Sequence, residues 1–171
     1  MFRFFGKPKE PVKLTEIFDL YISEINELFC WINASDNTEI QHDEVAYFLA
    51  SLIAFQYFRA TKTEPTDKST AMIDQFYEDI LRTEIQLNPN ADEAVALARR
   101  RYSEYTAMFL PARTVGPDRG EKVVTLLLHA FESIFAKSAK SYMIKIYTAA
   151  PVFDELAVGL LRDIERRGKS K

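Results

Sequence analysis

The sequence of 171 residues is poor in the residues that turn or break a chain. It holds only 5 glycines and 7 prolines, and it lacks the Asn-Gly and Asp-Gly steps that mark β-hairpins. It also lacks sustained alternation of apolar and polar residues, so nothing in it predicts a β-sheet. A single cysteine, Cys30, excludes an intramolecular disulfide.

Long apolar runs are missing as well. No segment approaches the roughly 20 apolar residues that are needed to span a bilayer. The N-terminal residues 1–8 are broken too soon, at Gly6 and Pro8, to predict a secretory signal. We therefore expect a soluble, cytoplasmic protein, and a chain of this length is long enough to form one domain with a substantial core.

Apolar residues recur at helical spacing through almost the whole chain. The predicted fold class is therefore all-α, a compact bundle of six to seven helices. Two of these helices, at about 38–59 and 118–137, are apolar over most of their circumference, which is typical of helices in the centre of a bundle. Asp118 and Glu121 form a capping pattern at the start of the second. We expect the two helices to pack against each other.

The charge distribution suggests three parts: a basic N-terminal arm at 1–13, a single helical domain at 14–167, and a disordered basic tail at 168–171 behind a helix stop at Gly168. The arm has four basic residues against one acidic residue, or +3. Residues 159–171 also carry +3, so the net charge of −3 leaves −9 on the remaining body. Nucleic-acid binding needs a concentrated basic face, and an acidic body argues against it.

Two histidines limit the metal chemistry that the chain can support. Glu39 and His42 stand at the E-x-x-H spacing that places both ligands of a carboxylate-bridged metal site on one helix face. Such sites need a second string of this kind, and the sequence has none. We therefore predict no metal and no cofactor, and Glu39 and His42 stay only weak metal candidates.

His129 and Cys30 both lie in apolar surroundings along the sequence, so we expect both side chains to be buried. His129 with Glu132 is the weak candidate for a pocket that binds a small molecule or cofactor. No catalytic residue is predicted. A cysteine nucleophile needs a base within reach, and a cysteine beside Trp31 in a helix is a poor candidate.

Arginines supply two further candidate sites. The run Arg99, Arg100 and Arg101 is expected to form a solvated face that pairs with acidic neighbours, with a basic interaction patch as the alternative. Arg113 lies in the longest predicted loop and Arg119 near the helix start that follows it. Because helix N-termini favour anions, this pair is a candidate anion site, although the loop lacks the glycines of a phosphate-binding loop.

Phe2, Phe4 and Phe5 stand among the basic residues of the N-terminal arm. Three placements are open for them: docking on the body of the protein or disorder, contact with a partner or a second copy, and insertion into an anionic membrane surface. A segment this short binds a membrane weakly when it acts alone.

Aromatic residues make up 13% of the chain, and aromatics anchor both cores and interfaces. Since no catalytic motif is present, our leading hypothesis is a non-enzymatic interaction or regulatory protein that binds a protein partner or forms a homodimer. The alternative is a helical bundle that binds a small molecule or cofactor, with enzymatic activity left open. The third hypothesis is a peripheral membrane protein tethered by its N-terminus.

Overall fold

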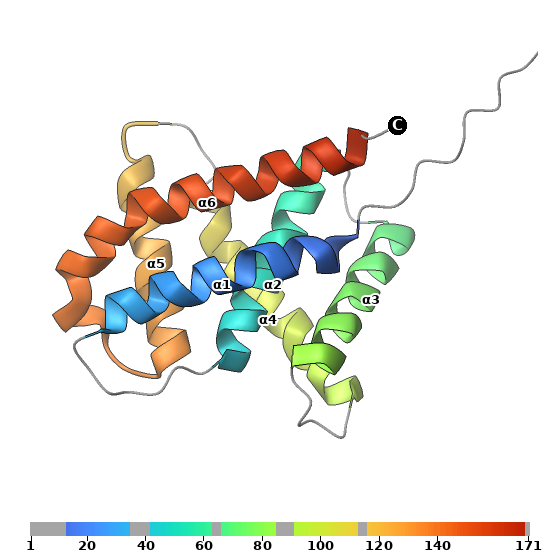
Figure 1. Ribbon diagram of the computed structural model, residues 1–171, viewed down its shortest axis with the longest axis horizontal. Coiled ribbons are helices and arrows are strands. Elements are labelled where there is room, and N and C mark those ends of the chain that lie inside the picture. The colour runs from blue at the N-terminus through green and yellow to red at the C-terminus, as the bar shows by residue number, and fades with distance from the viewer. Residues whose placement is uncertain (1–12, 35–41, 63–65, 85–90, 113–115, 170–171) are drawn as a thin grey trace, which may run out of the picture.

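The computed structural model describes residues 13–34, 42–62, 66–84, 91–112 and 116–169, and these residues form a bundle of six α-helices with no strand (Figure 1). The elements are α1 (Leu14–Asn33), α2 (His42–Thr61), α3 (Asp67–Glu84), α4 (Ala91–Ala112), α5 (Arg119–Phe135), the short 3-10 helix η1 (Ala139–Tyr142) and α6 (Met143–Lys169). The predicted all-α bundle is confirmed.

Helix α2 is the central element, as its composition predicts. Its residues from Glu44 to Gln56 are all buried, so no face of this segment is left for solvent. The helix contacts each of the five other α-helices. Helix α5 also packs on α2, but it makes more of its contacts with α4 and α6, and Thr125, His129 and Glu132 form an exposed stripe along it.

Phe48 lies at the middle of the core. Its ring contacts the rings of Phe29, Tyr105, Phe109 and Phe153 at centroid distances of 5.7, 5.2, 5.8 and 5.8 Å. These four residues belong to α1, α4 and α6, so one side chain of α2 links three neighbouring helices. Most aromatic residues of the described chain are likewise buried or partly buried, so the high aromatic content mainly builds the core.

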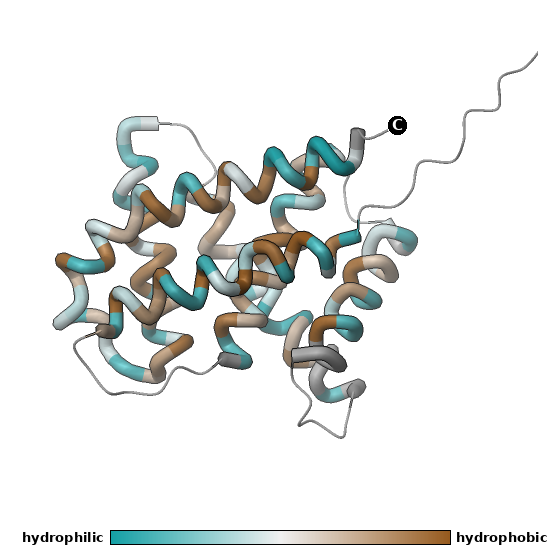
Figure 2. Tube along the Cα trace, viewed as in Figure 1, coloured by the Kyte–Doolittle hydropathy of each residue, from teal (hydrophilic) through white to brown (hydrophobic). Residues whose placement is uncertain are grey.

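Helices α1 and α6 lie side by side and run in opposite directions (Figure 1). Two polar contacts fix their register: Tyr21 donates a hydrogen bond to Asp163, and Arg167 donates one to Glu16. Figure 2 shows hydrophobic and hydrophilic positions alternating along both helices, as expected for helices that cover a core on one face only. Among the described helices, none has the length and apolar content that crossing a membrane requires.

Two helices continue through a proline, and one helix end differs from the sequence prediction. Helix α4 continues through Pro111 to Ala112, and α6 continues through Pro151. Helix α6 also continues through Gly168 to Lys169. Gly168 does not adopt the positive φ that a glycine helix stop uses, so the predicted stop is wrong. Residues 170 and 171 lie outside the described part of the chain.

The turn after α5 is held by Lys137. Its ammonium donates hydrogen bonds to Asn33 Oδ1 at 2.5 Å and to the Tyr142 hydroxyl at 3.0 Å. The same ammonium lies over the rings of Phe131, Phe135 and Tyr142, at 4.6 to 5.6 Å from the centroids. A cation enclosed by aromatic faces is stabilised by their negative potential. Lys137 thus joins the end of α5 to α1 and η1.

Ala136 precedes this lysine and ends α5 with φ of 49°. Because the left-handed region suits glycine, Ala136→Gly is expected to raise the free energy of unfolding by about 0.5–1 kcal/mol. Urea denaturation measures the change. Ala107→Gly is the control, since this exposed helical alanine should lose about 0.5–1 kcal/mol when it becomes glycine. Equal losses in both variants would contradict the expectation.

Candidate functional site

A surface groove with a volume of about 350 Å³ lies between α1 and α6. We call it the α1/α6 groove. It is lined by Leu20, Tyr21 and Glu24 from α1 and by Val152, Glu155, Leu156, Gly159 and Asp163 from α6. Its lining combines apolar side chains with three carboxylates.

The middle of the groove is shaped by a close approach of the two helices. A Cβ atom placed on Gly159 would lie 3.2 Å from the Tyr21 hydroxyl, so the absence of a side chain there makes room for the tyrosine. Tyr21 donates a hydrogen bond of 2.9 Å to Asp163 Oδ2. Burial, together with this carboxylate, raises the pKa of the Tyr21 hydroxyl, so it stays protonated and keeps donating at neutral pH.

Two carboxylates of the groove are available to a ligand. Asp163 is occupied, since it accepts hydrogen bonds from Tyr21 and Arg166. Glu24 and Glu155 are exposed, and neither has an ion pair with any other described residue. The groove therefore presents uncompensated negative charge.

The apolar part of the groove is open to solvent. Leu20 is 54% exposed and Val152 is 50% exposed, although both are large apolar side chains. Ile144 and Tyr147 near the start of α6 and Trp31 near the end of α1 are exposed as well. Contiguous exposed apolar side chains framed by polar residues are typical of interaction surfaces.

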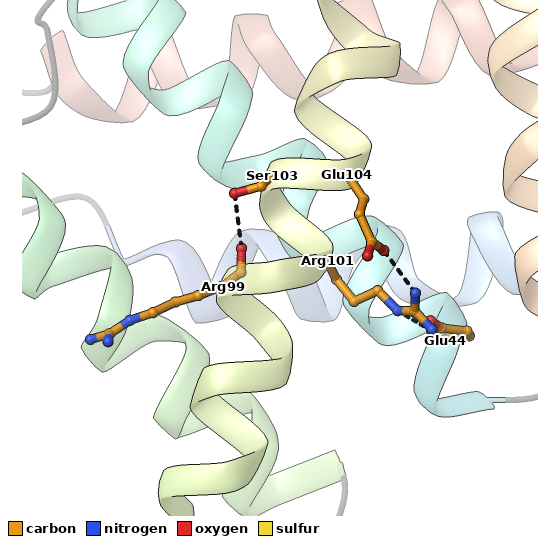
Figure 3. Close-up of polar contacts among 5 residues, drawn as sticks. All are labelled: Glu44, Arg99, Arg101, Ser103 and Glu104. Carbon is orange, nitrogen blue, oxygen red and sulfur yellow. Dashed lines mark hydrogen bonds and ion pairs between the residues drawn. The ribbon is translucent and has the colours of Figure 1, made fainter.

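Arg99, Arg100 and Arg101 have different surroundings. Figure 3 shows Arg101 beside Glu44 and Glu104, whereas the side chain of Arg99 points the other way. Arg99 binds both carboxylate oxygens of Asp74 on α3, at 2.9 and 2.7 Å. Arg101 forms ion pairs with Glu44 on α2 and with Glu104 on its own helix. The expected pairing with acidic neighbours is seen for these two residues, while Arg100 is exposed. Most of the run joins helices, which leaves little of it as a basic patch.

Glu44 is the buried partner in this cluster, with 5% of the residue exposed. Burial raises the pKa of its carboxyl, and the charge and hydrogen bond of Arg101 oppose that rise. The pair therefore stabilises a carboxylate that the core alone would disfavour.

A small cavity of about 40 Å³, partly open to solvent, lies where α2, α4, α5 and α6 meet. It has room for two or three water molecules but not for a cofactor. Arg119 lines it and binds Asp154 at 2.5 Å, so this side chain already has an anionic partner within the protein. Arg113, the other residue of the predicted anion site, lies outside the described residues.

Neither the α1/α6 groove nor the small cavity is lined by His129 or Glu132, the residues of the predicted pocket. His129 is exposed, so the expectation of a buried histidine is wrong. Its position shares the outer stripe of α5 with Thr125 and Glu132, while the apolar stripe of the helix turns inward. Glu132 accepts a hydrogen bond from the Ala139 backbone at 3.1 Å and so helps to hold η1 against the end of α5.

Cys30 is exposed, and its predicted burial is also wrong. Phe29 and Ile32 face the core, whereas Cys30 and Trp31 lie on the opposite side of α1. Apolar neighbours in sequence thus do not share a face on a helix.

Some predicted residues lie outside the description. Phe2, Phe4, Phe5 and Glu39 fall in undescribed segments, and only the backbone of His42 is described, at the start of α2. Within the described segments, no group of three His, Cys, Asp or Glu side chains is placed to hold a metal ion.

Sequence reasoning missed the α1/α6 groove altogether. Nothing local in the sequence shows that Gly159 faces Tyr21, because these residues are far apart in sequence. The sequence did carry one indication of an interaction surface, since the apolar residues Leu20 and Val152 lie outside the buried stripes of their helices. Comparison with protein-family models, with characterised proteins and with solved structures finds no match to this chain.

Proposed function

We propose that this protein is a non-enzymatic interaction protein whose α1/α6 groove binds a basic, apolar segment of a partner protein. The observation that carries the proposal is the pairing of open apolar side chains, Leu20 and Val152, with the uncompensated carboxylates of Glu24 and Glu155. Burial of a partner's apolar side chains against Leu20 and Val152 is favourable. The carboxylates of Glu24 and Glu155 favour a partner that has lysine or arginine beside those side chains.

The expected affinity is moderate. Full burial of a leucine or valine is worth about 1.5–3 kcal/mol, and both side chains here are already half-buried. Surface charge pairs add about 1 kcal/mol or less each and act mainly on the association rate. Such a groove suits reversible, regulatory binding rather than a permanent assembly.

The alternative hypothesis of a small-molecule or cofactor binder has weaker support. The small cavity of about 40 Å³ between α2, α4, α5 and α6 is much smaller than the roughly 300–1,000 Å³ of typical ligand pockets. The α1/α6 groove reaches that size, but it is open along its length and bordered by acidic side chains. This shape and charge fit an extended segment of protein better than a small molecule.

A charge placed in the groove is expected to weaken partner binding. A photo-crosslinking residue at Val152 identifies the partner in the native cell, and titration of the purified partner then measures the dissociation constant. Val152→Asp should raise that constant about tenfold or more, because it puts an uncompensated carboxylate against the apolar part of the partner.

Leu110 supplies the matched control, since it is 45% exposed on α4, which does not line the groove. A crosslinker at Leu110 should not capture the same partner, and Leu110→Asp should change the dissociation constant by less than about twofold. Capture at both positions, or equal weakening by both aspartates, would count against the groove.

A further inference from the structure

We infer that the small cavity between α2, α4, α5 and α6 is a binding site separate from the α1/α6 groove, and that it takes the carboxamide group of a small neutral molecule. Two buried polar atoms of residues that line the cavity carry this inference. Gln56 Oε1 and Arg119 Nε have no hydrogen-bond partner among the described residues. A buried polar group without a partner costs free energy, so a ligand that pairs with both atoms is stabilised there.

Gln56 supplies a hydrogen-bond acceptor. Its Nε2 donates a hydrogen bond of 3.1 Å to the carbonyl oxygen of Ala157 on α6, and this contact fixes which amide atom is the nitrogen. The whole residue is only 4% exposed, so Oε1 is shielded from solvent. A ligand that reaches Oε1 has to bring an N–H or O–H donor.

Arg119 supplies a hydrogen-bond donor. Its Nη2 binds Asp154 Oδ1 at 2.5 Å, which holds the guanidinium in place and compensates its charge. The Nε atom of the same guanidinium is buried without an acceptor. Because arginine stays protonated, this N–H remains a donor at any physiological pH. The same ligand therefore has to accept a hydrogen bond here.

A primary carboxamide meets both requirements, because its NH₂ group donates and its carbonyl oxygen accepts. A carboxylate has the same shape, but it only accepts. One of its oxygens would then stand against Gln56 Oε1, and the nearby charge of Asp154 would repel it. The polar lining thus favours a neutral amide over the corresponding anion.

The rest of the lining favours an organic molecule over water. A well-held buried water makes about three hydrogen bonds, and apolar walls offer it few partners. An apolar group that displaces poorly held water gains affinity. The volume of about 40 Å³ suits a group of about four heavy atoms, such as acetamide, and the open side lets a longer molecule extend outward. The apolar residues of the wall include Leu52, Phe55, Phe109, Val123, Leu126 and Phe153.

Titration of the full chain with acetamide tests the site. In the ¹⁵N-labelled protein, NMR follows the side-chain NH₂ of Gln56 and the Nε–H of Arg119. Both signals should shift and saturate with a dissociation constant of about 10 mM, as expected for so small a ligand. Acetate, the matched anion, should bind at least about fivefold more weakly.

Two substitutions test the two polar atoms separately. Arg119→Lys keeps a cation for Asp154 but lacks the Nε–H, and Gln56→Met keeps a similar volume but lacks the acceptor. Each should weaken acetamide binding at least about threefold. The signal of the residue that is kept reports binding in each variant, so a folding defect in one leaves the other informative. Arg100→Lys, at an exposed position of α4, is the control and should leave the affinity unchanged.

Saturable binding of acetamide that is weaker for acetate and weaker in both variants supports the inference. Equal or tighter binding of acetate overturns it in favour of an anion held by Arg119 and Arg59, which also lines the cavity. The absence of saturation up to about 200 mM, or unchanged affinity in both variants, overturns it in favour of water alone.

The cavity and the α1/α6 groove use different residues of α6. Phe153, Asp154 and Ala157 line the cavity, whereas Val152 and Glu155 line the groove. Val152→Asp should therefore leave acetamide binding unchanged while it weakens partner binding. Failure of the carboxamide site and failure of the proposed function are thus separate results.

Discussion

Replacing Phe48 by alanine is expected to lower the free energy of unfolding by about 3–5 kcal/mol, the range for truncation of a phenylalanine in a closed core. Phe48 is fully buried, and its ring contacts Phe29, Tyr105, Phe109 and Phe153. Truncation removes the ring and leaves a cavity among side chains from three other helices, which cannot all move inward at once. For a domain stable by about 5–15 kcal/mol, this is a large fraction of the total.

Urea denaturation followed by circular dichroism measures this loss. Tyr147→Ala is the matched control, since Tyr147 is an aromatic residue that is 55% exposed on α6. Its truncation should cost less than about 1 kcal/mol, because little packing is removed. A loss below about 1.5 kcal/mol for Phe48→Ala would mean that the core refills the space and that Phe48 is not its centre.

Helical periodicity predicted the fold class, because the described helices bury their apolar residues in one common core. The same reasoning placed α2 in the centre correctly. It also placed α5 in the centre, because that segment is rich in apolar residues. Exposed polar side chains nevertheless form a stripe at every third or fourth position of α5, and His129 and Glu132 lie on it. Composition reports how apolar a helix is, whereas burial depends on how those residues are distributed around the axis.

Cys30 shows that neighbours in sequence are as poor a guide to burial as overall composition. It stands between Phe29 and Trp31, yet one step along a helix turns a side chain by about 100°, so Phe29 is buried while Cys30 and Trp31 face solvent. Weighing each residue by its angle on the helix, rather than by its sequence neighbours, would have predicted both exposures.

The pairing of α1 with α6, which forms the groove, was beyond sequence reasoning for a different reason. It depends on which two helices become neighbours, and the contact that fixes them joins Tyr21 to Asp163. A single sequence carries no signal for such long-range pairs. The aromatic content pointed to an interface, but the structure places most of those rings in the core, so the leading hypothesis now rests on the exposed apolar and acidic residues of the groove.

Arg101→Met is expected to destabilise the protein by about 2–4 kcal/mol, because it leaves the buried carboxylate of Glu44 without its cation. The side chain of Glu44 on α2 is only 7% exposed. Arg101 on α4 pairs with it where α2 packs against α4. Methionine keeps much of the arginine's apolar volume, so the loss reports the charge rather than packing. Arg100→Met, at the exposed neighbouring position, should cost less than about 0.5 kcal/mol.

The dependence on pH separates a charge effect from a packing effect. Burial raises the pKa of Glu44 in the folded protein above its unfolded value, so the folded state binds the proton more readily. A raised carboxyl pKa means that stability is lost as pH rises from the unfolded pKa through the folded one. Removing Arg101 raises the folded pKa further, since the attraction that opposed burial is gone.

The cost of Arg101→Met should therefore shrink as the pH falls from 8 toward 5, by at most about 1.4 kcal/mol per pH unit. Adding Glu44→Gln should recover most of the lost stability and remove this pH dependence, because a neutral amide needs no cation. Urea denaturation of the three proteins at several pH values measures both effects. A constant cost at every pH, or no recovery with Glu44→Gln, would show that Arg101 stabilises the bundle by packing and not by holding a buried charge between α2 and α4.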